Sequence, residues 1–162
     1  MKRFLTSLLF IYAFTANADF YDKNQNMEEG WALLLGTPMA VSQAPLLPEG
    51  IILTSIQKVE DYPSVILSTY KECSKPKEYD FYKAKIGSTW VNMIAVCTHD
   101  NRVKIGARTQ KGADFIVQQL VKSKDPIVLE LEASYSTVEI SIPATNFKQA
   151  LEYFEQRELN AL

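Results

Sequence analysis

The two cysteines, Cys73 and Cys97, are the residues of this chain with the most definite chemistry. A redox-active pair needs its thiols close together, as in Cys-x-x-Cys, where the surroundings stabilise one thiolate. These two cysteines are far apart in the sequence, and free or reactive thiols are the alternative to a bond between them. In an oxidising compartment an isolated pair is most simply a structural disulfide. We therefore predict a Cys73–Cys97 disulfide that stabilises the fold by about 3 kcal/mol through chain entropy.

The single histidine, His99, is followed directly by Asp100. A His–Asp contact could serve acid–base catalysis, and a neutral imidazole could bind a metal. A zinc site, however, needs three or four convergent ligands, and no second histidine or cluster of cysteines accompanies His99. We expect a solvated histidine in a turn, and we predict no metal site and no cofactor.

Two groups of carboxylates have the residue types that cleave glycosidic bonds. The first, Glu60-Asp61, lies in sequence typical of a loop. The second falls on the outward alternation of two predicted strands, where carboxylates ordinarily face water, and consists of Glu130, Glu132 and Glu139. The sequence has no nucleophile elbow, no Ser-x-x-Lys in an apolar setting and no phosphate-binding glycine loop. We therefore predict no catalytic residues.

Three aromatic residues, Tyr79, Phe81 and Tyr82, lie among lysines and are candidate partner-binding residues. Tyrosine offers a large contact area at a small entropic cost. Strand alternation places Tyr79 and Phe81 on one face and Tyr82 on the other, so packing of one face into the core is the plainer interpretation. The apolar run from Trp31 to Leu35 has the same two interpretations, a core strand or a partner-binding segment.

Residues 1–18 have the three parts of a secretory signal peptide. A basic start is followed by an apolar run from Phe4 to Phe14 and by an Ala-x-Ala ending. We predict cleavage after Ala18, which makes Asp19 the first residue of the mature chain. A retained membrane anchor would need about 20 apolar residues, so we expect no stable membrane insertion. The compact signal is typical of bacteria and predicts a periplasmic or secreted protein.

The size and charge of the chain limit its partners. Its 162 residues suffice for one domain with one core, and its formal net charge of −2 becomes more negative once the basic start is removed. A mildly acidic protein does not attract nucleic acid. We expect the partner to be another envelope or secreted protein.

Alternating apolar residues predict a series of strands after residue 50. We place them at residues 51–56, 64–73, 79–86, 89–98, 103–108, 127–133 and 137–142. The chain then divides into a signal peptide (1–18), an N-terminal arm with a proline-rich loop (19–50), and a β-rich domain (51–162). Tight reversals between strands predict a mainly β (α+β) fold, a small antiparallel sheet or sandwich.

One or two helices should pack on this sheet. A short helix is expected over residues 113–122, and an amphipathic C-terminal helix over residues 145–158. The second has Phe147 and Phe154 on one face, and Asn146 with Gln149 matches a capping box.

Parts of the later chain are similar to a known family. The segments that match are Leu46-Leu47-Pro48-Glu49-Gly50-Ile51, Glu72-Cys73, Phe115 through Leu120 with the strand pair that follows, and Ile142-Pro-Ala-Thr-Asn-Phe147-Lys-Gln-Ala150-Leu151. Together they resemble the invasion-associated locus B family of small exported bacterial proteins, which end in a strand and a Phe-x-x-Ala-Leu helix. The family's early cysteine is missing here. The resemblance implies a β-rich fold with a terminal helix and supplies no catalytic residues.

These observations favour a non-enzymatic exported protein that binds another protein, as an accessory factor of a bacterial envelope or secretion assembly. An inhibitor or immunity protein that blocks a hydrolase or toxin is the second hypothesis, with residues 57–63 or 74–82 as the blocking loop. An envelope hydrolase is the third, and it requires Glu60, Asp61 or His99 to line a cleft.

Overall fold

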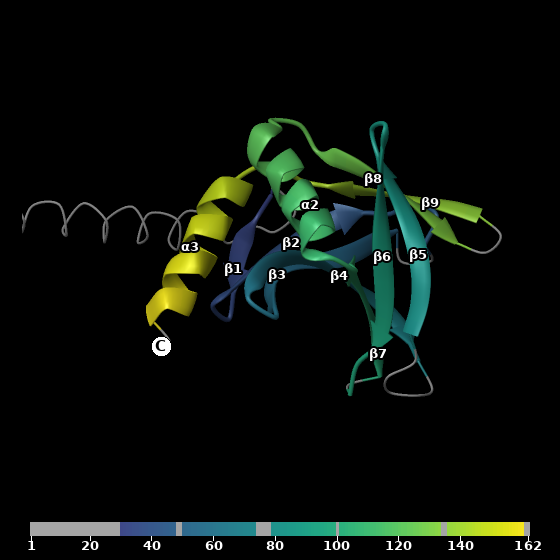
Figure 1. Cartoon of the computed structure of the whole chain (residues 1–162), viewed down its shortest axis with the longest axis horizontal. Helices are drawn as coiled ribbons and strands as arrows, with labels where there is room; N and C mark the ends of the chain where they lie inside the picture. Colours follow the sequence, from purple (N-terminus) through teal and green to yellow (C-terminus); the bar gives the residue numbers. More distant parts are fainter. Residues whose placement is uncertain (1–29, 48–49, 74–78, 100, 134–135, 161–162) are drawn as a thin grey trace, which may run out of the picture.

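The computed structural model describes residues 30–47, 50–73, 79–99, 101–133 and 136–160. Most of these residues lie in antiparallel strands, and two helices pack beside them (Figure 1). The strands are β1 (Ala32–Leu34), β2 (Thr37–Gln43), β3 (Ile51–Val59), β4 (Tyr62–Glu72), β5 (Tyr79–Ile86), β6 (Thr89–Cys97), β7 (Arg102–Ala107), β8 (Ile127–Ala133) and β9 (Ser136–Ile142). The helices are α2 (Gln110–Lys122) and α3 (Phe147–Asn160). The predicted mainly β antiparallel fold with a C-terminal helix is confirmed.

The sheet closes on itself into a barrel, which the alternation within single strands does not indicate. Its strand order is β1-β2-β3-β4-β7-β6-β5-β8-β9, and β9 pairs again with β2 through Gln43 and Ser141. One edge of β2 pairs with β3, and the other edge is shared between β1 and β9. Closure gives β9 a second partner within the chain, which limits the edge that is left for pairing with other chains.

The barrel has two mouths that are built differently. The turns β1–β2, β3–β4 and β5–β6 lie at one of them, where α2 and α3 also begin. We call this the helix-side mouth. The β6–β7 turn and the end of β4 lie at the other, which we call the disulfide-side mouth.

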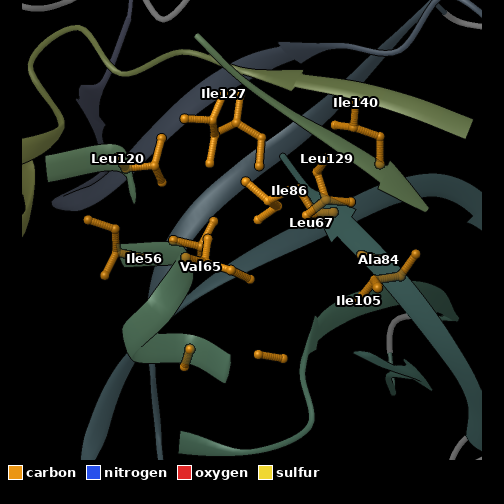
Figure 2. Packing of buried hydrophobic residues seen from close by; sticks show 14 of the residues in the cluster. Ile56, Val65, Leu67, Ala84, Ile86, Ile105, Leu120, Ile127, Leu129 and Ile140 are labelled. Carbon is orange, nitrogen blue, oxygen red and sulfur yellow. The ribbon is translucent and has the colours of Figure 1, made fainter. Parts of the chain in front are cut away.

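Helix α2 lies against the strand ends at the helix-side mouth. Its buried residues Ala113, Ile116 and Leu120 belong to the same hydrophobic cluster as the strand residues, and Figure 2 shows Leu120 among them. The approach is close, because a Cβ on Gly112 would lie 2.9 Å from Val91 Cγ1. The helix therefore closes one end of the barrel core.

Apolar side chains that alternate along the strands fill the barrel. Those fully buried include Ile52, Ile56, Leu67, Met93, Leu129, Ile140 and Ile142. Two inward hydroxyls, on Ser42 of β2 and Thr54 of β3, hydrogen bond to each other at 2.5 Å. This bond satisfies polar groups that would otherwise be costly to bury.

Trp31, near the start of the described chain, contacts the segment between β9 and α3. Its backbone N–H donates to the Thr145 carbonyl (3.0 Å), and its indole N–H donates to the Pro143 carbonyl (2.7 Å). Its ring meets Phe147 of α3 edge to face, with centroids 4.9 Å apart. Gly30 allows this approach, because a Cβ there would lie 2.7 Å from the Thr145 oxygen.

The predicted disulfide between Cys73 and Cys97 is present, with the two Cα atoms 5.9 Å apart. It joins the end of β4 to the end of β6, two strands that are separated in the sheet by β7. The Cys73 N–H also donates to the carbonyl of Asn101, at the start of β7 (2.9 Å). The bridge thus fastens three strands at the disulfide-side mouth.

The prediction of an arm with a proline-rich loop over residues 19–50 is wrong in part, because residues 37–43 form strand β2. The inward residues of this strand are Pro38, Ala40 and Ser42, all buried. They are small or polar, so they lack the apolar alternation by which strands are recognised. Strands β1 and β2 also belong to the same sheet as residues 51–142, so the described residues 31–43 are part of the barrel.

The helices begin at other residues than expected. Helix α2 starts at Gln110 because the Thr109 hydroxyl accepts a hydrogen bond from the Gly112 N–H (3.2 Å). Helix α3 starts at Phe147, and the preceding Asn146 has a φ of 62°. An N-cap residue is normally extended, so the backbone of Asn146 differs from the usual N-cap conformation, and its capping role stays a prediction.

Candidate binding groove

An open groove of about 350 Å³ lies at the helix-side mouth, between the β3–β4 hairpin and the second half of α3. The hairpin lines it with Lys58, Asp61, Tyr62 and Pro63, and the helix lines it with Phe154, Glu155, Glu158 and Leu159. The buried aromatic rings of Tyr62 and Phe154 form its floor. The charged residues stand at its rim.

The local sequence explains why the groove exists. The apolar stripe of α3 turns Phe147, Ala150 and Phe154 into the protein. Leu159 lies outside this stripe and is 72% exposed. The β3–β4 hairpin turns tightly at Glu60, which has a φ of 54°, and this leaves a space beside the helix.

Tyr62 connects the groove to α2. Burial raises the pKa of the Tyr62 hydroxyl, and the nearby carboxylates of Glu60 and Asp114 raise it further. Each effect disfavours the ionised, negatively charged form of the Tyr62 hydroxyl. Tyr62 therefore stays neutral and offers an aromatic surface with a hydroxyl donor.

The rim of the groove carries more negative than positive charge. Lys58 pairs with Glu158, with Nζ and Oε2 3.6 Å apart. Within the described residues, neither Asp61 nor Glu155 has an ion-pair partner. Two carboxylates thus remain available beside the apolar floor.

The β1–β2 turn, at the same mouth of the barrel, has two exposed leucines. Arg157 of α3 donates a hydrogen bond to the Gly36 carbonyl, which holds that turn against the helix. Leu34 is 43% exposed and Leu35 is 97% exposed. Leu35 also has a φ of 50°, a conformation that costs a leucine roughly 1–2 kcal/mol.

A second hollow, of about 520 Å³, lies on the outer face of α2. Its lining residues all come from this one helix: Gln110, Lys111, Asp114, Phe115 and Gln118. A face of a single helix with mixed charges offers little enclosure, so this hollow is the weaker candidate.

The residues of the hydrolase hypothesis do not come together. Glu60 and Asp61 precede β4 at the helix-side mouth, whereas His99 lies in the turn before β7, which pairs with the far end of β4. Strand β4 has 11 residues, so the two positions are separated by roughly 30 Å. One cleft cannot hold both.

The carboxylates of β8 and β9 lie on the outer wall of the barrel, as predicted. Glu130 is paired with Lys85 of β5 at 3.9 Å, and Glu132 lies opposite Lys83 in the strand register. Glu139 is exposed on β9. Within the described residues, no group of histidine, cysteine and acidic side chains could hold a metal ion.

The three candidate aromatic residues, Tyr79, Phe81 and Tyr82, all lie on strand β5. Tyr82 packs partly buried against the core. Tyr79 and Phe81 pair through their backbones with Val96 and Ile94 of β6, and their side chains lie outside the described part. A binding role for these two residues stays a prediction.

The apolar run from Trp31 to Leu35 is partly in the core and partly exposed at the surface. Trp31 and Ala32 are fully buried in the core, whereas Leu34 and Leu35 face water. The predicted cleavage site, between Ala18 and Asp19, lies outside the described residues. In the part of the chain that is described, no helix has the length and apolar character needed to cross a membrane.

The sequence predicts only one of the two sides of the groove. The sequence predicts residues 57–63 as a candidate blocking loop, and Lys58, Asp61, Tyr62 and Pro63 line one side of the groove. The opposite side, on α3, is not predicted, because Phe154 lies on the apolar stripe of the helix and its spacing indicates a core residue. The missed signal is Leu159, an apolar residue outside the helix stripe.

Comparison of the chain with protein-family models, with curated proteins and with solved structures finds no match to any of them.

Proposed function

We propose that this chain is an exported, non-enzymatic protein-binding factor that serves a bacterial envelope or secretion assembly, and that it binds its partner at the helix-side mouth. The observation that carries the proposal is the apolar groove with exposed Leu159 at its edge. The β1–β2 turn at the same mouth has two more exposed side chains, Leu34 and Leu35. Gathered exposed apolar side chains rimmed by polar residues are typical of interaction sites.

The position of Leu35 supports a role in binding. A glycine or asparagine would adopt its backbone conformation at a lower cost, and the side chain is 97% exposed. The fold therefore gains little from a leucine here. A partner that buries this side chain would supply the missing stabilisation.

The rigidity of the barrel suits recognition of a partner. The strands beneath the groove are closed into a barrel, and the disulfide fastens the opposite mouth. A surface held in place before binding loses less conformational entropy when a partner arrives.

Export is supported by two independent features. Residues 1–18 have the order of charges, apolar residues and small residues that a signal peptide requires. The Cys73–Cys97 disulfide fits an oxidising compartment. The resemblance to the invasion-associated locus B family points to the same compartment.

Site-specific photo-crosslinking in the producing cell tests the binding role. A crosslinking amino acid at Leu159 should give a discrete adduct with one envelope or secreted protein, identifiable by mass spectrometry. The same amino acid at Thr137, exposed on the outer wall at β9, is the matched control and should give no such adduct. Equal adducts at both positions, or none at Leu159, would reject the proposal.

The turn beside the groove supports a second candidate function, inhibition of a hydrolase or toxin. Glu60 and Asp61 are exposed at the tip of the β3–β4 hairpin, as a blocking loop requires. This candidate predicts a tight complex with a purified toxin or lysozyme and loss of the enzyme's activity. Binding of a partner without any loss of a hydrolase activity would favour the accessory role.

A further inference from the structure

We infer that the groove between the β3–β4 hairpin and α3 takes a basic, apolar segment of the partner protein, in which large aliphatic side chains are flanked by lysine or arginine. This inference rests on the proposed function and specifies the chemistry of the partner. It follows from the apolar residues at the floor of the groove, from the charged residues at its rim and from the carboxylates close to Tyr62.

The floor selects an apolar side chain. Tyr62 and Phe154 are 9% and 8% exposed, and Pro63 lies beside them. Contact with these rings removes apolar surface of both partners from water, which is the main source of binding free energy in such grooves. Leu159 at the open edge extends the same contact.

The rim selects positive charge. Of its four charged residues, Lys58 and Glu158 pair with each other, so their charges largely cancel. Asp61 and Glu155 then remain, one on each side of the floor. A segment with a cation on either side of its apolar anchor would meet both carboxylates.

Two further carboxylates lie close to Tyr62. Glu60 and Asp114 lie near enough to Tyr62 to raise the pKa of its hydroxyl. The negative charges of these two residues therefore add to those of Asp61 and Glu155. An acidic segment or an anionic lipid surface would be repelled here, whereas a basic segment would be attracted.

Two synthetic peptides test the inference with the full-length, disulfide-bonded chain. One has leucines at helical spacing with lysine at all other positions, and its twin has glutamate in place of each lysine. We expect the lysine peptide to bind with an affinity that falls as salt is added, and we expect no binding of the glutamate twin. Isothermal titration calorimetry measures both.

Matched variants locate the interaction. Asp61→Asn with Glu155→Gln should weaken binding of the lysine peptide about three- to tenfold, because two exposed ion pairs are lost. Glu132→Gln with Glu139→Gln removes the same charge from the outer wall and should leave the affinity unchanged. Leu159→Gln should weaken binding without changing its salt dependence.

Failure of this inference can be told apart from failure of the proposed function. Binding of the glutamate twin, or an equal loss in both charge variants, overturns the inference. If neither peptide binds while Leu159 still crosslinks to a partner in cells, the inference is wrong and the proposed function stands. If neither peptide binds and no crosslink forms, both are wrong.

Discussion

Trp31 and Trp90 show how differently the same residue type can be used in one chain. Trp31 is fully buried and donates its indole N–H to the Pro143 carbonyl, whereas Trp90 is 52% exposed on the outer side of β6. The apolar sequence around Trp31 predicted burial as one of two alternatives. Its partners lie more than a hundred residues later, and no local pattern in the sequence identifies them.

Replacement of each tryptophan by phenylalanine should separate these roles. We expect Trp31→Phe to lower the free energy of unfolding by about 1–3 kcal/mol, because the Pro143 carbonyl loses its donor. Trp90→Phe should change it by less than about 0.5 kcal/mol. Urea denaturation followed by the fluorescence of the remaining tryptophan measures both, and equal losses would contradict the role given to Trp31.

Tyr62 should make the stability of the fold depend on alkaline pH. Its pKa is raised in the folded protein by burial and then by Glu60 and Asp114, whereas in the unfolded chain it is near 10. The stabilisation is therefore fully present below about pH 10 and is lost as the pH rises toward the folded pKa.

Titration of tyrosine absorbance, with unfolding measured at several alkaline pH values, checks this expectation. Tyr62→Phe should remove the component with a raised pKa and reduce the alkaline loss of stability. Glu60→Gln should lower the pKa of Tyr62. An unchanged titration in the Tyr62→Phe variant would show that another tyrosine is responsible.

At the scale of elements, strand β2 shows where sequence reasoning fails. Strands such as β8 and β9 have strict apolar alternation, and both were predicted with nearly correct bounds. Strand β2 turns Pro38, Ala40 and Ser42 inward, and prolines nearby favoured a loop. Small inward residues suit a crowded barrel interior, but they give no hydrophobic signal.

The disulfide-side mouth should depend strongly on its covalent bridge. Cys73 and Cys97 are separated by 24 positions, and a loop of that size is worth about 3 kcal/mol of stability. The double variant Cys73→Ser, Cys97→Ser should lose this amount in urea denaturation. Reduction of the unmodified protein with dithiothreitol is the control and should give the same loss.

Hydrogen exchange can show which part of the structure loses stability when the disulfide is removed. We expect faster exchange of backbone amides at the end of β4 and in the β6–β7 turn, while α2 and the helix-side mouth change little. Uniform acceleration over the whole chain would mean that the bridge acts only on global unfolding.

At the scale of the whole molecule, the sequence predicted the class of fold but neither the closure of the barrel nor the groove. Strand type depends on neighbouring residues, whereas closure depends on β2 meeting β9, nearly a hundred positions later. The groove depends on the same kind of long-range packing, because a hairpin before residue 64 meets a helix after residue 146.

The proposed export predicts a processed N-terminus, which mass spectrometry can check. Protein purified from the envelope or medium of the producing cell should begin at Asp19 and have no free thiol. Ala18→Arg should block cleavage, because a large charged residue does not fit the signal peptidase site. An intact Met1 in the unmodified exported protein would contradict the predicted signal peptide.

The order in which the chain is made has a consequence for how the barrel can form. Trp31 is held by Pro143, 112 positions later, and Gly36 is held by Arg157, 121 positions later. Because synthesis proceeds from the N-terminus, the first strand must wait for the last helix before its contacts exist. Contacts of such high sequence separation slow folding. In a chain that is cut short before α3, the ring of Trp31 lacks its packing contact with Phe147.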